Sequence, residues 1–339
     1  MWYNEYGKDG DVVLSSRVRL ARNIKGIPFP RRSNEEQQNK VLSLCKSAVL
    51  ENSSVLKETV KYIDLSVMED YEKQAVAEKH LISPQMMEND MKRGLLLSDD
   101  NKISILLNEE DHLRIQVMEA GFDLDTCFVE ANRIDDLMEE TIDYAFDEQI
   151  GYLTCCPTNA GTGMRASVMV HLPALTMSGT INRVIDSLTQ LGVTVRGIFG
   201  EGSKATGHIY QISNQLTLGA TEEDILDKFK QIVAEVIDKE REMRRHMYAE
   251  DRYRLEDRLM RSYGILRHAV ILTSSEAMKC LSDVRLAVDL GLIQDVKPEV
   301  LNAVTYEILP ANIMKEYNLA DPAERDLKRA EIIKERMCG

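Results

Sequence analysis

The 339-residue chain lacks several of the patterns that would assign a function at once. No apolar run approaches the roughly 20 residues needed to span a bilayer, and the N-terminal stretch MWYNEYGKDGD is polar and has no signal-peptide pattern. The 6 cysteines show no repeated CxxC spacing, which argues against a zinc site and favours a reducing, cytosolic compartment. The GxxxxGK[ST] loop and the HRD and DFG motifs are absent, which excludes P-loop and protein-kinase geometry.

Positive charge is also scarce. The chain has 42 Lys and Arg against 56 Asp and Glu, a net charge of −14. Such an acidic protein is a poor general binder of nucleic acid or membrane surfaces, so direct nucleic-acid and membrane partners are not expected. Local clusters of arginine therefore become informative. The length allows one large and one smaller domain.

The stretch CCPTNAGTGMRASVMVHLP, residues 155–173, predicts a glycine-containing loop that leads into a strand. Gly161 and Gly163 allow close backbone approach, and Arg165 is a fixed cation suited to phosphate or carboxylate. With the thiol of Cys156 nearby, the stretch favours an anion site beside a reactive centre. A surface loop with an incidental arginine fits the spacing equally well.

Arg17 and Arg19 follow a short strand expected at residues 12–14. In an extended segment both side chains point to the same face, where they repel each other unless an anion lies between them. A solvated basic edge is the alternative. His80, at the exit of a helix expected over residues 67–80, either stacks on a base or packs in the interior.

Acidic residues occur in similar positions. A buried strand at residues 102–107 runs into Glu109, Glu110 and Asp111, with Arg114 after them. These acids either cap the first turn of a helix or form a reactive group at the end of a strand. Glu201 lies between two glycines in the loop of a hairpin expected over residues 193–213, and hairpin geometry does not explain a carboxylate there.

The other expected elements are helices. Residues 33–52 begin with a capping box of Ser33 and Glu36, and a helix at 132–149 begins at Asn132. The remaining helices are expected over residues 180–191, 221–262 (as one long helix), 275–290, 297–309 and 321–337.

Taken together, these residues suggest a site with two halves. Five arginines at strand ends or glycine loops could neutralise a triphosphate, whereas two glutamates could hold a planar guanidinium in bidentate geometry. The arginines are Arg17, Arg19, Arg114, Arg165 and Arg196, and the carboxylates are Glu110 and Glu201.

Five stretches in order resemble one known family: SSRVRLARN, EKHLISP, NEEDHLRI, CPTNAGTGMRASV and RGIFGEGSKATGHIYQISN. They are similar to the catalytic domain of the guanidino phosphotransferases, the phosphagen kinase family of creatine and arginine kinases. The resemblance implies an α+β fold, with a central antiparallel sheet flanked by helices over residues 11–243 and an all-helical C-terminal domain over 244–339.

Two features resemble the bacterial protein-arginine kinases of the McsB type more than the phosphagen kinases. The first motif begins already at Ser15, so the helical N-terminal domain that helps enclose a small guanidino substrate is not expected, and an open cleft would admit an arginine side chain of a protein. The C-terminal segment also resembles the RDxxRA phosphoarginine-binding motif; its residues are Arg325, Asp326, Leu327, Lys328, Arg329 and Ala330.

The resemblance also implies roles for individual residues. Glu110 and Glu201 would hold and deprotonate the target guanidinium, with Glu201 preferred as the base, and Cys156 would assist by aligning it. ATP with Mg²⁺ would be the cofactor, without a protein-held metal. The implied nucleotide-binding residues are Ser15, Ser16, Arg17, Val18, Arg19, His80, Arg114, Arg165, Ala166, Ser167, Val168, Met169, Arg196, Gly197, Ile198, Phe199, Gly200 and Glu201.

The resemblance further implies partners and a cellular role. The substrates would be proteins with exposed arginines, including basic DNA-binding repressors, marked in a stress response for a Clp-type protease. A zinc-finger activator, a Clp ATPase, a homodimer in which the C-terminal domain takes part, and a cytoplasmic location are also implied. A small-molecule guanidino kinase and a non-catalytic phosphoarginine-binding adaptor remain the alternatives.

Overall fold

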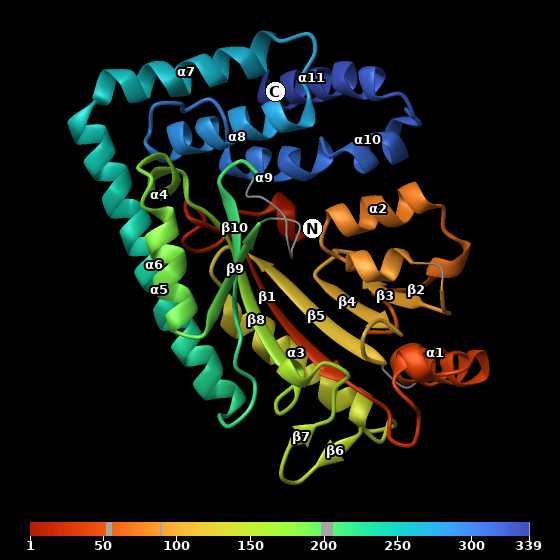
Figure 1. Cartoon of the computed structure of the whole chain (residues 1–339). Helices are drawn as coiled ribbons and strands as arrows, with labels where there is room; N and C mark the ends of the chain where they lie inside the picture. The colour runs from red at the N-terminus through yellow and green to blue at the C-terminus, as the bar shows by residue number, and fades with distance from the viewer. Residues whose placement is uncertain (52–55, 89, 198–205, 339) are drawn as a thin grey trace.

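A single antiparallel sheet of 8 strands organises the computed structural model, which describes residues 1–51, 56–88, 90–197 and 206–338 (Figure 1). The strand order is β2-β3-β4-β5-β1-β8-β10-β9, so β1 and β8 lie in the middle. The strands are β1 Val13–Arg22, β2 Val60–Asp64, β3 Gly94–Ser98, β4 Ile103–Leu107, β5 Leu113–Ala120, β8 Met164–His171, β9 Val193–Gly197 and β10 Ile209–Asn214. Two further strands, β6 Phe146–Asp147 and β7 Gly151–Tyr152, form a separate hairpin.

Four helices cover one face of this sheet: α1 Glu35–Leu50, α3 Leu124–Glu139, α5 Ile181–Gln190 and α6 Glu222–Glu250. They bury alternate residues of the strands, among them Val18 and Leu20 of β1 and Val168 of β8. Because successive side chains of a strand point to opposite faces, Arg17 and Arg19 must point to the other side.

In the described ranges, the opposite face of the sheet is covered only at its ends. Helix α2 (Asp70–Glu78) packs over Leu95 and Leu106 at one end, and a layer of C-terminal helices packs over Leu14, Met118, Met169 and Ile209 at the other. That layer consists of α7 Arg252–His268, α8 Ser274–Asp289, α9 Pro298–Glu307, α10 Pro310–Tyr317 and α11 Pro322–Cys338. The short α4 (Pro173–Met177) follows β8. The centre of this face remains polar.

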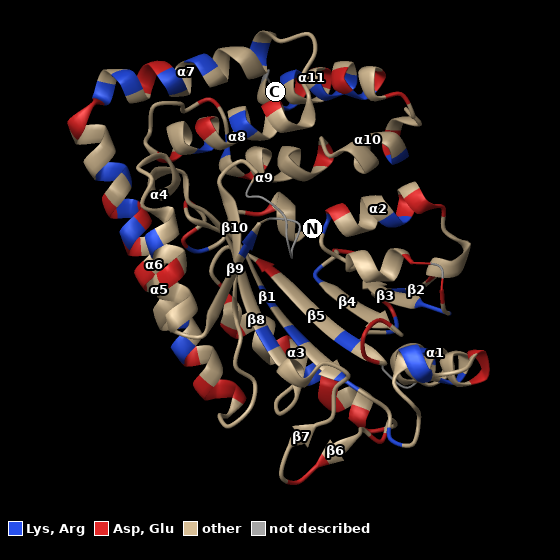
Figure 2. Ribbon diagram, viewed as in Figure 1, with Lys and Arg blue, Asp and Glu red and all other residues tan. Residues whose placement is uncertain are grey.

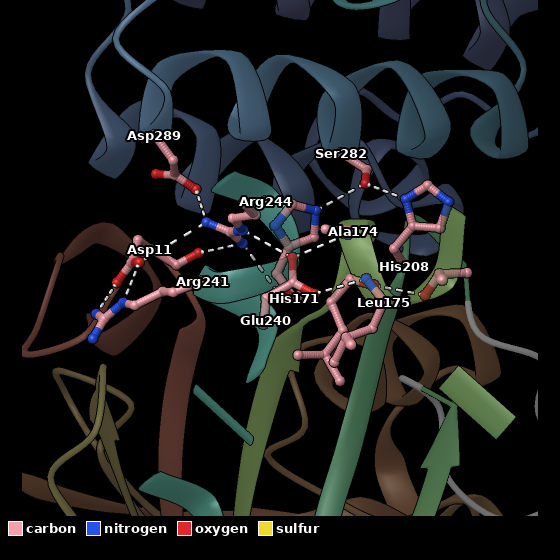
Figure 3. Close-up of polar contacts among 12 residues, drawn as sticks. Asp11, His171, Ala174, Leu175, His208, Glu240, Arg241, Arg244, Ser282 and Asp289 are labelled. Carbon is pink, nitrogen blue, oxygen red and sulfur yellow. Dashed lines mark hydrogen bonds and ion pairs between the residues drawn. The ribbon is translucent and has the colours of Figure 1, made fainter. Parts of the chain in front are cut away.

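Buried ion pairs join α6 to the C-terminal layer (Figure 3). Arg244 of α6 donates from Nε to Glu240 at 2.8 Å and from an Nη to Asp289 of α8 at 3.1 Å. Ser282 of α8 lies between the rings of His171 and His208, with its Oγ 2.8 Å from a nitrogen of each. The C-terminal layer is therefore tied to the sheet by polar contacts as well as by apolar packing.

The main expected elements are present, but several boundaries were wrong. The first helix has its capping box one residue later than predicted, at Asn34 and Gln37 rather than Ser33 and Glu36. The helix predicted from Asn132 begins at Leu124 behind the cap Asp123, which accepts from the amide of Thr126 at 3.1 Å. The helix predicted over residues 221–262 ends at Glu250, and α7 starts after Asp251.

The acidic run at residues 109–111 does not begin a helix. It forms the turn between β4 and β5, where the amide of Asn108 donates to the carbonyl of His112 at 3.0 Å. Helix capping is thus excluded as the reason for these three acids. In the described part of the chain, no helix is both long and apolar enough to cross a membrane.

Candidate active site

Arginines from three neighbouring strands meet on the polar face of the sheet. The register pairs Arg19 of β1 with Arg165 of β8, and Ala21 of β1 with Arg114 of β5. Blue segments on β1, β5 and β8 lie side by side in Figure 2. Like charges directly opposite one another in a sheet are destabilising, so this arrangement needs a reason other than stability.

Neutral groups hold two of these side chains. Arg17 donates from Nε to Ser167 Oγ at 3.1 Å, and Arg165 donates to the hydroxyls of Thr194 and Ser213 at 3.0 and 3.2 Å. Among the described residues, no carboxylate lies within ion-pair distance of Arg17 or Arg19, and the buried Nε of Arg19 has no hydrogen-bond partner. Within the described part of the chain, Arg17 and Arg19 are thus short of negative charge.

The pKa values of these arginines reflect that shortage. Burial, followed by repulsion from Arg114 and Arg165, lowers the pKa of Arg17 to about 10. Burial and the charge of Arg17 lower the pKa of Arg19 well below its usual value. An anion with several negative oxygens would relieve this repulsion, which is the property expected of a polyphosphate site.

Arg114 is the exception, because it is paired with carboxylates from the β4–β5 turn. Its Nη2 lies 2.6 Å from Glu109 and 3.9 Å from Glu110. Glu109 is buried and also accepts from Ser83 Oγ, whereas Glu110 retains about 30% of its side-chain exposure. Burial, then the neighbouring Asp111, raises the pKa of Glu110. Glu109 therefore orients Arg114, and Glu110 remains available to a ligand.

The loop after β7 brings the thiol to the same place. Asp111 accepts from the amide of Cys155 at 2.7 Å, which ties this loop to the acidic turn. Cys156 is half-buried, with Sγ 3.0 Å from Thr158 Oγ1. Gly161 has a φ of +101°, and a Cβ there would lie 2.3 Å from the carbonyl oxygen of Thr217, so only glycine fits. The loop is thereby packed against the segment that follows β10.

These groups line one cavity of about 710 Å³, a size suited to a nucleotide. Arg196 and His80 also line it, from the end of β9 and the end of α2. Burial, then the charge of Arg17, lowers the pKa of His80 to about 3, so its ring is neutral at physiological pH. The predicted site residues that line the cavity are Arg17, Arg19, His80, Glu110, Arg114, Cys156, Arg165 and Arg196.

Other predicted nucleotide-binding residues do not line it. Val18, Ala166 and Val168 are buried in the core on the opposite face, because they alternate with the arginines along their strands. Ser15, Ser16 and Met169 are also buried; Ser16 Oγ accepts from the amide of Asp123 at 3.0 Å and so supports the start of α3. Ser167 positions Arg17, and Gly197 ends β9. Ile198, Phe199, Gly200 and Glu201 lie outside the described residues.

The six residues of the C-terminal motif lie on α11 and are not equivalent. Leu327 is 46% exposed, and Arg325, Asp326 and Lys328 are half-buried. Arg329 and Ala330 are interior, 1% exposed each. Arg329 donates to the carbonyls of Ile308 and Leu272 at 2.9 and 2.8 Å, so its guanidinium supports neighbouring segments of the helical layer.

Two further carboxylates line the cavity: Glu78, which was not predicted, and Glu109, which was noted in the acidic run but given no role in the site. Glu109 stands beside the predicted Glu110, and its spacing from Arg114 could have suggested the pair. Nothing in the local sequence distinguishes Glu78, because its partners lie more than 230 residues away.

Comparison with known proteins agrees with this geometry. Residues 40–243 match the model of the ATP:guanido phosphotransferase C-terminal catalytic domain. The chain belongs to the ATP:guanido phosphotransferase family. Residues 252–338 match the model of the protein-arginine kinase McsB C-terminal domain, which places the chain in the protein-arginine kinase branch of the family.

Curated relatives support this placement over nearly the whole length. The chain is 49% identical to the protein-arginine kinase of Caldanaerobacter subterraneus subsp. tengcongensis over 326 residues, which cover 96% of each chain. It is 45% identical to the protein-arginine kinase of Bacillus subtilis over 99% of this chain and 93% of the relative.

Solved structures show the same fold. A crystal structure of lombricine kinase matches with a TM-score of 0.61 and 26% identity, over 70% of this chain and 68% of that one. The duplicated taurocyamine kinase of Schistosoma mansoni matches 70% of this chain and 35% of its own, with a TM-score of 0.63 and 24% identity. The predicted α+β fold with a helical C-terminal region is thus confirmed; the proposed limits 11–243 and 244–339 stay predictions.

Proposed function

We propose that this enzyme transfers the γ-phosphoryl group of ATP to arginine side chains of proteins. The observation that carries the proposal is the cavity in which Arg17, Arg19 and Arg165 face Glu110 and Cys156. One half is suited to a polyphosphate and the other to a guanidinium. The relatives named protein-arginine kinase support the choice of a protein substrate.

ATP fits the cationic half. Several fixed guanidiniums can take part in charge-assisted, bidentate hydrogen bonds to phosphate oxygens. They can also stabilise the charge that spreads over the transferred phosphoryl group in the transition state. Mg²⁺ bound with the phosphates would supply further positive charge to the same oxygens.

The anionic half must activate a poor nucleophile. A guanidinium has no free lone pair until it loses a proton, because its pKa lies above about 12. Glu110 lies at the cavity with a raised pKa, and Glu201 is proposed as the second carboxylate; one would orient the guanidinium while the other accepts its proton. Cys156 would help to align the same group.

The C-terminal motif is proposed to bind phosphoarginine. Arg325 is the more accessible of its two arginines, and Lys328 lies beside it with 21% of its side chain exposed. Arg329 would hold the base of such a site through its carbonyl contacts. Such a site could recruit proteins that already carry the modification.

The cellular role is also a proposal. A kinase with a net charge of −14 favours basic substrates, such as DNA-binding repressors. We infer that the mark directs proteins to a Clp-type protease during stress, in the cytoplasm, with a zinc-finger activator and a homodimeric kinase.

The decisive test is mass spectrometry, without acid treatment, of a basic protein incubated with the enzyme and Mg-ATP. We expect phosphoarginine on the protein. Parallel reactions with free arginine or creatine as the substrate should give little product. Glu110→Gln and Glu201→Ala should each abolish the signal. Efficient phosphorylation of a free guanidino compound, without protein phosphorylation, would identify a small-molecule kinase instead.

A further inference from the structure

A buried carboxylate at the edge of the cavity accepts hydrogen bonds from the N-terminus of a helix in the C-terminal layer. Glu78 is the last residue of α2, is 5% exposed and lines the cavity. Its two carboxylate oxygens lie 3.1 Å from the amide of Ala311, and Oε2 also accepts from the amide and the side chain of Asn312 at 3.1 and 2.9 Å. Ala311 and Asn312 are in the first turn of α10.

Glu78 accepts from the first free backbone amides of helix α10. Pro310 occupies the first position of α10 and has no N–H, so Ala311 and Asn312 carry its first free amides. The positive end of the helix dipole also faces the carboxylate. Burial raises the pKa of Glu78, whereas these hydrogen bonds act in the opposite direction.

His80, two residues after Glu78, also lines the cavity. His80 has a φ of +60°, a left-handed conformation that is costly for a residue other than glycine. Its carbonyl accepts from Gln116 of β5 at 2.8 Å, and its ring packs edge-on against Tyr306 of α9 with centroids 5.8 Å apart. The strained turn is therefore held by the sheet on one side and by the C-terminal layer on the other.

Helix α10 is held in place by a contact with α11. Arg329 of α11 donates to the carbonyl of Ile308, two residues before α10 begins. Helix α10 thus connects the interior of the C-terminal layer to the cavity wall, and α2 and α10 lie side by side in Figure 1.

We propose that Glu78 is a positioning residue for nucleotide binding, which acts by locking the α2–His80 wall of the cavity onto α10. The C-terminal layer is then part of the nucleotide site, although none of its residues contributes to the cationic cluster. This inference rests on the proposed use of ATP by the cavity.

The chain offers a matched control in Glu240. It is 0% exposed and accepts from the amides of Ala174 and Leu175 at 3.0 Å each, directly after Pro173 at the first position of α4. The contacts with the helix end resemble those of Glu78, although Glu240 also accepts from Arg244, and Glu240 is not among the residues that line the cavity. Loss of a helix-end carboxylate can therefore be compared with and without a connection to the site.

The test is titration of the full-length Glu78→Gln and Glu240→Gln variants with ADP by calorimetry, together with KM for ATP, KM for protein substrate and kcat. Glutamine keeps the size but turns a donor toward the helix amides. We expect Glu78→Gln to raise the Kd for ADP and the KM for ATP about tenfold, since small misplacements of a binding wall are costly. The KM for protein should not change, and Glu240→Gln should bind ADP as the wild type does.

Asn312→Ala provides a second route if Glu78→Gln fails to fold, because it removes one of the four hydrogen bonds and leaves the carboxylate in place. We expect it to weaken ADP binding in the same direction, about threefold. Unchanged ADP binding in the Glu78 variant, or equal losses in the Glu78 and Glu240 variants, would overturn the inference. Failure of the wild type to bind ADP would instead refute the proposed function.

Discussion

The molecule contains two groups of arginines, one buried and one half-buried, whose partners differ. Arg244 of α6 is surrounded by carboxylates, including Glu240 and Asp289 (Figure 3). Arg17 and Arg165, on the polar face of the sheet, are held by hydroxyl groups, and Arg19 faces Arg165 directly. Carboxylates neutralise Arg244, whereas no carboxylate of the described residues lies within ion-pair distance of Arg17 or Arg19.

The difference separates a structural role from a binding role. A buried ion pair costs desolvation but is matched within the fold, so its removal damages stability. A half-buried cluster of like charges without counter-charges weakens the fold and is maintained for a ligand that neutralises it. Arginine count alone would not have distinguished the two groups.

The largest expected effect follows removal of a guanidinium from the uncompensated cluster. Arg19→Ala should lower kcat/KM for protein phosphorylation about a thousandfold, as for other arginines that neutralise a transferred phosphoryl group. Its melting temperature should stay constant or rise, because repulsion from Arg17 and Arg165 is relieved. Arg133→Ala, at an arginine 58% exposed on α3, is the control and should retain full activity.

Removal of Arg244, which is paired with carboxylates, should lower stability and not activity. Arg244→Met leaves Glu240 and Asp289 buried without their cation and should reduce the free energy of unfolding by about 3–5 kcal/mol in urea denaturation. Arg261→Ala removes an exposed pair with Asp257 and should leave the free energy of unfolding almost unchanged, because solvent screens such pairs. Equal losses in the Arg244 and Arg261 variants would contradict the structural role of the buried ion pairs of Arg244.

Ligand binding should affect only one of the clusters. ADP at about 100 times its Kd should add about 2.7 kcal/mol to the free energy of unfolding of the wild type. The Arg244→Met variant, although less stable, should gain the same increment, whereas Arg19→Ala should gain little. Thermal melts of the three proteins with and without ADP measure this directly.

The smallest expected effect concerns His80, which faces the uncompensated cluster. Its pKa is lowered to about 3 by burial and by Arg17, so between pH 3 and about 6.5 the unfolded chain binds a proton that the native protein does not. Stability from this group is present at pH 7 and is lost as the pH falls. From pH 7 to pH 5 the wild type should lose about 2 kcal/mol more than His80→Gln in denaturant titrations. Parallel pH profiles would contradict the assignment.

Several features of the site could be predicted because they depend on local alternation. In β1, Val18 and Leu20 enter the core while Arg17 and Arg19 point away, which is the arrangement expected of an extended segment. The short strand predicted at residues 12–14 was nevertheless underestimated, since β1 continues through the arginines to Arg22. The polar residues that alternate with the apolar ones made the strand harder to recognise in the sequence.

Other features depend on distant partners and could not be predicted. Arg329 was predicted as part of a phosphoarginine-binding motif, and the motif gave no indication that its guanidinium donates to the carbonyls of Leu272 and Ile308 in the interior. Glu78 lies in a helix with no distinguishing motif, and its cap on α10 comes from a segment 233 residues away. Such contacts are set by packing of the whole chain and leave no periodic signal.

The corner at Asp251 has a consequence for how movement could pass through the protein. The family match for the catalytic part ends at residue 243, inside α6, and the C-terminal match begins at residue 252, the first residue of α7. Asp251 closes the one helix and caps the next, accepting from the amide of Arg254 at 3.3 Å. With 29 residues, α6 is about 43 Å long. Because a single residue, and not a flexible linker, joins α6 to α7, a rotation of the C-terminal helices would be transmitted along α6 to the sheet.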